Sequence, residues 1–249
     1  MGVGHDMLAI SPVDLIFAML LNLLLVVIAR IVRVADTPGL IVAWVLGVAM
    51  LYSASAAGYV PFVVFVAGCA LLTRTGAGRK EWMGLPAASR AAVSAGRILS
   101  CCLPPTIFAV ATLHRAFQPS IFTVAVAGGF ASAFGSIAST ELGVLMNARP
   151  VLLLTMRRTY PGAEGAISME GAVDGLAAAC LMSLVAWIAG GVRFSNVWIV
   201  ILAAIAGNLA RILLGPILSG KMKHAGLLTD FFGTSLACVV ALSVARMAQ

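Results

Sequence analysis

The sequence predicts an all-α, polytopic integral membrane protein. Hydrophobic residues make up 61% of its 249 residues and charged residues only 10%, whereas charged residues form about 25% of a typical soluble domain. Several apolar runs approach the roughly 20 residues that a helix needs to cross a bilayer. These runs lack the alternating pattern of membrane β-barrel strands. We therefore expect a single membrane-embedded domain that includes residues 1–249.

Eight apolar segments are predicted to be transmembrane or re-entrant helices, because lipid requires backbone hydrogen bonds to close within each segment. In chain order they include residues 13–29, 39–57, 58–72, 98–113, 121–146, 172–190, 197–214 and 227–244. The third segment is short and the fourth contains Pro104 and Pro105, so either one is open to interpretation as a broken or partly inserted segment.

The basic residues orient these segments. One set of alternating loops contains most of them, namely Arg30, Arg33, Arg74, Arg79, Lys80, Arg90, Arg97, Arg149, Arg157, Arg158, Lys221 and Lys223. The opposite set contains Arg115, Arg193 and Arg246, and Arg211 lies inside the seventh segment. By the positive-inside rule the first set is cytosolic, which places both termini on the other side. This topology explains the net charge of +7 without a nucleic-acid partner.

The acidic residues that approach the membrane gather on the same predicted face. They are Asp36, Glu141, Glu164, Glu170, Asp174 and Asp230. Ionisable groups beside apolar spans are costly and usually functional. Glu170 and Asp174 are four residues apart and therefore share a helix face, where like charges repel unless a cation or basic partner lies between them. One hypothesis is a magnesium site; the alternative is stabilisation of the helix N-terminus by its dipole.

Other chemistries have little support in the sequence. The five cysteines lie in apolar runs without a C-x-x-C pair, and the three histidines lack metal-ligand spacing. Neither a P-loop nor a G-x-S-x-G motif is present. Arg149, Arg157 and Arg158 flank the acidic segment 159–175, and guanidinium groups bind phosphate well.

Residues 141–178 resemble the signature region of a family that includes plant and cyanobacterial phytyl-phosphate kinase and the animal transmembrane protein 19. This region reads ELGVLMNARPVLLLTMRRTYPGAEGAISMEGAVDGLAA. Members have S-E-I/L-G followed by V-P-x-G-T-E/D-G-A-V-S-x-E-G-T-x-A-G. The upstream loop LTRTGAGRKEWMGLPAASR is similar to another family segment and matches it at Thr73, Lys80, Gly84 and Arg90. Order and spacing agree from about Gly39 to the last span.

The resemblance implies phosphoryl transfer to an isoprenoid monophosphate, such as a phytyl or prenyl phosphate, from a nucleoside triphosphate such as CTP. In that interpretation Glu141, Glu164, Glu170 and Asp230 are catalytic, and Glu141, Glu164, Glu170 and Asp174 bind Mg²⁺. The implied substrate-binding residues are Lys80, Arg90, Arg157, Arg158, Ser168, Asn208 and Arg211. Phosphoryl transfer depends on positioning and cationic clamps more than on covalent catalysis, which suits acids and bases gathered at one face.

The chain departs from the family pattern at three polar positions. The family has Asp where this chain has Ser136, an acid where it has Arg211, and Asn where it has Gly233. These departures indicate direct contact of Arg211 with phosphate, a different substrate, or an inactive member. A bilayer-embedded transporter or lipid-binding protein is the other functional class, although we see no internal repeat to favour it. We expect an inner-membrane or organelle-envelope location and leave homo-oligomer formation open.

The topology is directly testable in the loop between residues 73 and 97. Because five basic residues lie in this stretch, we expect the substitution Ala77→Cys to react with an impermeant thiol reagent from the cytosolic side. Labelling only from the outside would overturn the orientation and the face proposed for the site.

Overall fold

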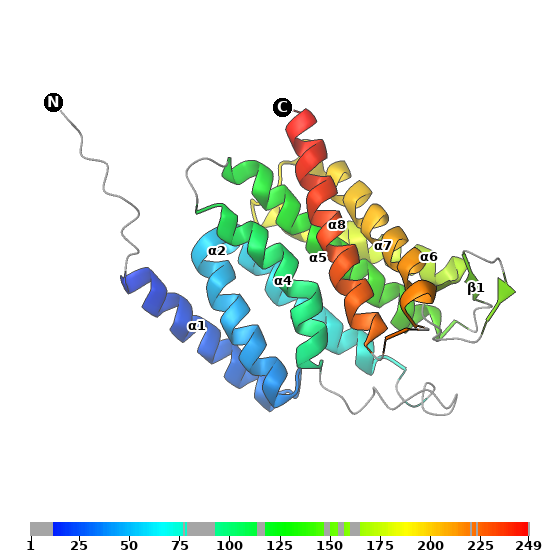
Figure 1. The fold of residues 1–249 in the computed structure, drawn as a ribbon. Helices are drawn as coiled ribbons and strands as arrows, with labels where there is room; N and C mark the ends of the chain where they lie inside the picture. Colours follow the sequence, from blue (N-terminus) through cyan, green and yellow to red (C-terminus); the bar gives the residue numbers. More distant parts are fainter. Residues whose placement is uncertain are drawn as a thin grey trace.

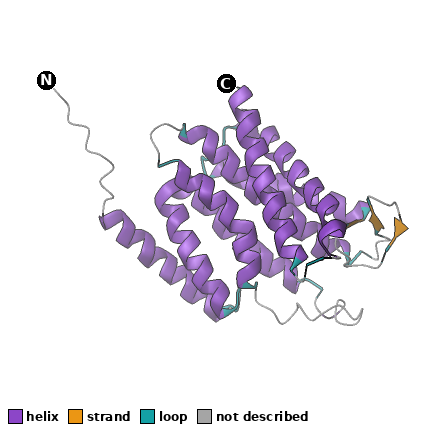
Figure 2. Cartoon of the chain, viewed as in Figure 1, coloured by secondary structure: helices purple, strands orange, loops and turns teal. Residues whose placement is uncertain are grey.

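The computed structural model describes residues 12–76, 78, 93–113, 118–146, 150–153, 157–159, 165–219, 221–222 and 224–248. Within these ranges the chain forms helices α1 (Pro12–Ile31), α2 (Thr37–Arg74), α4 (Ala95–Ala111), α5 (Pro119–Gly143), α6 (Met169–Ile188), α7 (Val197–Ser219) and α8 (Ala225–Met247), with a short 3₁₀ turn η2 (Phe194–Asn196) (Figures 1 and 2). Each predicted segment corresponds to one helix or to half of α2. The prediction of an all-α membrane fold is confirmed.

The long helix α2 contains both the second and the third predicted segments, and it doubles back on itself. A straight helix of its 38 residues would be about 57 Å long. The guanidinium of Arg74, at the C-terminal end of α2, nevertheless donates to the carbonyls of Val32 and Arg33, which precede the start of α2. Pro61 lies inside the helix and removes one backbone donor, which is a common cause of bending. The two halves, Thr37–Ala54 and Ala56–Arg74, are each apolar enough to span a membrane.

The fourth segment is also continuous, because α4 stays helical through Pro104 and Pro105. It is shorter than the spanning helices around it, as is the apolar part of α1. The prolines therefore do not break this segment into two pieces.

Helix α5 forms the centre of the bundle and packs against α2, α4, α6, α7 and α8. Almost all of its residues are buried, and it is rich in Gly, Ala and Ser. Its small residues allow neighbouring backbones to approach closely: a Cβ atom on Gly135 would lie 2.7 Å from the carbonyl oxygen of Gly175 in α6. Close approach through small residues is the usual basis of helix packing in lipid.

A small sheet lies outside the bundle, at its right-hand edge in Figure 2. Strand β1 (Val151–Leu152) pairs antiparallel with both β2 (Arg157–Arg158) and β3 (Ala166–Ile167). The sequence did not predict these strands, because two-residue strands are too short to show an alternating pattern.

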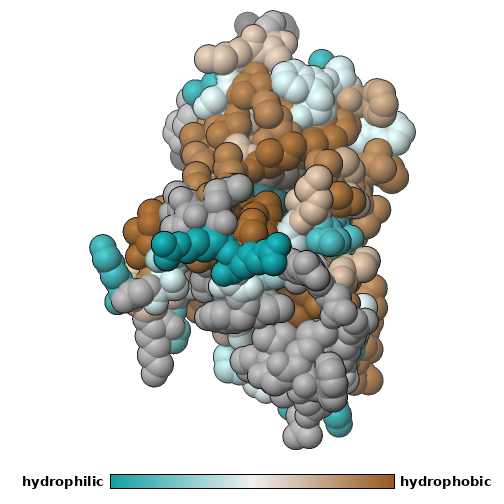
Figure 3. Space-filling model, turned by 90° about the vertical axis from the view of Figure 1, so that its right-hand side faces the viewer, coloured by the Kyte–Doolittle hydropathy of each residue, from teal (hydrophilic) through white to brown (hydrophobic). Residues whose placement is uncertain are grey.

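The outer surface is suited to lipid along most of the bundle. Large apolar side chains are exposed on α1, α6, α7 and α8. In Figure 3 the upper half of the visible face is mostly hydrophobic, and the longest hydrophilic strip crosses the face near its middle. The described ends of the chain, at the start of α1 and the end of α8, lie away from the end where α4, α6 and α8 begin (Figure 1).

We expect Gly135→Ala to destabilise the protein. Overpacking a tight core contact costs about 1–3 kcal/mol, which should exceed the roughly 1 kcal/mol gained by replacing Gly with Ala in a helix. The measurement is the thermal unfolding midpoint of the purified protein.

Gly78→Ala is the matched control, because no atom lies within 4 Å of the position that its Cβ would take. A Gly135→Ala variant as stable as wild type would show that α5 and α6 separate easily.

Candidate functional site

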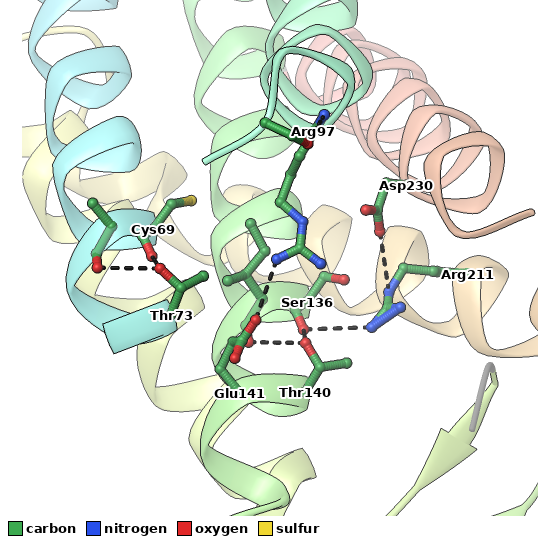
Figure 4. A network of polar contacts seen from close by, with 11 residues as sticks. Cys69, Thr73, Arg97, Ser136, Thr140, Glu141, Arg211 and Asp230 are labelled. Carbon is green, nitrogen blue, oxygen red and sulfur yellow. Dashed lines mark hydrogen bonds and ion pairs between the residues drawn. The ribbon is translucent and has the colours of Figure 1, made fainter. Parts of the chain in front are cut away.

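Two ion pairs lie at one end of the bundle, which we call the charged end and define by Arg97, Glu141, Arg211 and Asp230. Nη1 of Arg97 is 3.2 Å from Oε1 of Glu141, and Nε of Arg211 is 3.6 Å from Oδ1 of Asp230 (Figure 4). The four charges come from α4, α5, α7 and α8 and lie close together at this end (Figure 4).

The pair between Arg97 and Glu141 opposes the helix dipoles. Ser94 caps α4 by accepting a hydrogen bond from the backbone N–H of Arg97, so this cation lies at the positive end of its helix. Glu141 lies near the C-terminus of α5, which is the negative end. Each charge is unfavourable at its own helix end. Because α4 and α5 bring these ends together, the two charges offset one another.

The charge pattern of the sequence places Arg97 only in a cytosolic loop and not at the site. Ser94, three residues earlier, is nevertheless a typical N-cap and predicts that Arg97 belongs to the helix. Its partner is 44 positions away in the chain, and only the packing of α4 on α5 reveals the contact.

Arg211 has the acidic partner that a cation inside an apolar helix requires. Its side chain is 16% exposed and that of Asp230 is 10% exposed, so both members of the pair are mostly buried. Its Nη2 donates to the carbonyl of Ser136 at 3.5 Å. Helix α7 extends to Ser219 rather than to residue 214, so Arg211 lies about one turn deeper than the sequence predicted.

A narrow crevice surrounds this second pair between α5, α7 and α8. Its lining residues are Ser132, Ala133, Ser136, Gly207, Asn208, Arg211, Asp230, Gly233 and Thr234. Two of its oxygens, Oγ of Ser136 and Oδ1 of Asn208, are buried without a hydrogen-bond partner among the described residues. Buried polar atoms are usually paired, so these two oxygens mark the crevice as a functional candidate.

The three departures from the family pattern lie together in this crevice. Ser136, Arg211 and Gly233 come from three different helices, yet all three line it. Asn208 and Asp230, which match the pattern, line it too. The departures are therefore a single local change and not three scattered ones.

Gly165, in the signature region, lies against α7 beside Arg211 at the charged end. Its φ of +76° favours glycine, and a Cβ there would lie 2.7 Å from the carbonyl oxygen of Ile212, next to Arg211. Farther along, a Cβ on Gly143 would lie 3.0 Å from Cα of Gly171. The start of α6 is thus packed against the end of α5.

The predicted residues on α6 have different surroundings. Ser168 is the N-cap and accepts a hydrogen bond from the N–H of Gly171 at 3.0 Å. Glu170 is exposed in the first turn. Asp174 is partly buried, and its Oδ2 is buried without a hydrogen-bond partner among the described residues.

Other predicted residues are exposed or not described. Arg157 and Arg158 form β2, where both are exposed. Glu164, Lys80 and Arg90 lie outside the described residues, as does Arg149.

The structure does not bring the predicted magnesium ligands together among the described residues. In the described part of the chain, no group of three or more His, Cys, Asp and Glu side chains is placed to hold a metal ion. Glu141 is already paired with Arg97. Mg²⁺ usually requires only one or two carboxylates plus substrate phosphates. Because Glu164 lies outside the described residues, magnesium binding by Glu141, Glu164, Glu170 and Asp174 stays a prediction.

The fold and the charged end define a multi-pass integral membrane protein. The chain belongs to the integral membrane protein family DUF92, which it matches over residues 20–230. It is 26% identical over 215 residues to an uncharacterised membrane protein of Methanocaldococcus jannaschii, covering 84% of this chain and 86% of that relative. It is also 26% identical over 213 residues to an uncharacterised membrane protein of Synechocystis, covering 83% and 81% respectively. No solved structure matches the chain.

A double-mutant cycle should reveal coupling between Arg97 and Glu141. We expect the single substitutions Arg97→Met and Glu141→Gln each to lower the unfolding free energy. The sum of these two losses should exceed the loss in the double variant. The expected coupling is about 0.5–3 kcal/mol, as for other residues in one ion-pair network. Additive effects would show that the pair contributes nothing to stability.

Proposed function

We propose that this protein is a CTP-dependent isoprenoid-phosphate kinase whose reaction takes place at the charged end. The observation that carries the proposal is that two Arg–carboxylate pairs lie at the same end of the bundle as the start of α6, which belongs to the signature region. The resemblance of that segment to the phytyl-phosphate kinase family supplies the substrate class.

In the proposed reaction, a phosphate oxygen of the prenyl monophosphate attacks the γ-phosphorus of the nucleotide. A new P–O–P linkage forms, the bond between the γ-phosphorus and the bridging oxygen breaks, and the nucleoside diphosphate leaves. Catalysis of such a transfer is mostly positioning and charge stabilisation. The protein therefore needs fixed cations at the membrane boundary more than it needs a nucleophile.

The described side chains support these roles in two groups. The exposed guanidinium groups of Arg157 and Arg158 are available to bind phosphate oxygens bidentately. Arg97 and Arg211 are held in place by Glu141 and Asp230, and thus keep fixed positive charge near the transferred group. Lys80 and Arg90 are proposed to complete the phosphate clamp.

Magnesium is proposed to accompany the nucleotide, with Glu164 and Glu170 as its protein ligands. When bound, it would neutralise charge on the phosphate oxygens. The isoprenoid tail is proposed to lie in the bilayer beside the exposed apolar faces of α6, α7 and α8. The transporter alternative has less support, because Arg97 and Glu141 lie near helix ends and, of the four charges at this end, only Arg211 lies deeper in its helix.

The decisive experiment incubates the purified protein with labelled CTP or ATP and a panel of prenyl monophosphates. We expect a prenyl diphosphate to form with CTP. Absence of any diphosphate with every substrate pair would reject the kinase proposal.

Glu170→Gln should lower kcat by about 10²-fold, a typical loss when one transition-state electrostatic group is removed. Since the side chain is exposed, the unfolding midpoint should not change. Asp14→Asn is a matched control, because Asp14 lies near the start of α1 at the opposite end. Normal turnover by Glu170→Gln would show that this carboxylate has no catalytic role.

A further inference from the structure

We infer that Arg211 is a tethered cation that fills an oxygen-lined cation site between α5, α7 and α8. The inference rests on the geometry of the crevice alone and holds whether or not the protein is a kinase. The crevice is suited to small cations. In the wild-type protein, the guanidinium of Arg211 occupies the place of such a cation.

Two oxygens contact the guanidinium, and residues that line the same crevice carry two more that are unpartnered. A carboxylate oxygen of Asp230 lies 3.6 Å from Nε, and the carbonyl oxygen of Ser136 lies 3.5 Å from Nη2. The unpartnered Oγ of Ser136 and Oδ1 of Asn208 belong to the same crevice. Carboxylate, carbonyl, amide and hydroxyl oxygens are the ligands that hard cations take in proteins.

Because these groups are mostly buried, the carboxylate of Asp230 needs a cation beside it. Ser136 is only 6% exposed, and its unpartnered hydroxyl is one of the oxygens in the crevice. Arg211 is the one cationic side chain among the described residues that line the crevice. Without that charge, the nearly buried carboxylate of Asp230 would remain there unpaired.

The crevice is shaped around an arginine. A Cβ on Gly233 would lie 3.3 Å from Cβ of Arg211 and 2.8 Å from the carbonyl oxygen of Gly207. The absence of a side chain at Gly233 therefore makes room for the stem of Arg211. The guanidinium in this space lies 3.5 Å from the carbonyl oxygen of Ser136 and 3.6 Å from Oδ1 of Asp230. Its permanent charge offsets that of the carboxylate.

The inference predicts that truncating Arg211 opens a site for a free cation. Arg211→Ala should lower the unfolding midpoint by about 5 °C or more, because an unpaired buried carboxylate is strongly destabilising. Guanidinium chloride at a non-denaturing millimolar concentration, or magnesium chloride, should restore at least about half of that shift by binding the folded state. Wild type should not respond to either salt.

Three controls distinguish occupancy of this site from a general salt effect. Tetramethylammonium chloride should give no rescue, because it is too large and has no N–H donor. The double variant Arg211→Ala/Asp230→Asn should lose the rescue, because the carboxylate charge is gone. Arg193→Ala, an exposed position before η2, should show neither the loss of stability nor the rescue.

The inference would be overturned if no cation raised the midpoint of Arg211→Ala, if wild type responded equally, or if rescue persisted in the double variant. If Arg211→Ala does not fold, Arg211→Lys and Arg211→Met provide the test, since they have similar length but differ in charge. The tethered-cation role requires the Lys variant to have the higher midpoint. Equal midpoints would reject it. Because every readout is stability, a failed kinase assay leaves this inference unaffected.

Discussion

The close approach of helix backbones to α5 is the constraint on which the rest of the structure depends. Lipid tails are as apolar as Leu side chains, so helices in a bilayer associate through tight packing and not through exclusion of water. Gly135 and Gly175 bring α5 against α6, and Gly207 and Gly233 bring α7 against α8. The next residues along, Ser136 and Asn208, are thereby placed in one crevice with Arg211 and Asp230. The same contacts that hold the bundle together thus assemble its polar site.

The charges at this end are balanced as well as gathered. Arg97 and Glu141 each lie at the unfavourable end of their own helix dipole, and their mutual attraction offsets both penalties. Arg211 and Asp230 are more deeply buried, so either charge alone would be costly. Because each pair joins two different helices, the network favours one packing arrangement of α4 on α5 and of α7 on α8. Stability and organisation of the site are therefore coupled.

The sequence predicted most of the fold because spanning helices depend on local composition. Each of the eight apolar segments is helical. What the sequence did not reveal depends on tertiary contacts. The reversal of α2 is seen in the contact of Arg74 with Val32, and the role of Arg97 depends on how α4 is turned toward α5. The three departures from the family pattern looked unrelated until the crevice placed Ser136, Arg211 and Gly233 together.

The balance of charge also limits how an anion could be held at this end. The two ion pairs contribute no net charge, so they give a phosphate no long-range attraction, although they supply fixed dipoles once it is close. Attraction over distance must come from the excess of basic residues in the loops on this side, including the exposed Arg157 and Arg158. Screening by salt weakens such surface attraction much more than it weakens buried pairs. In the proposed kinase, exposed arginines would therefore capture the phosphate, and arginines whose charge is already offset would position it.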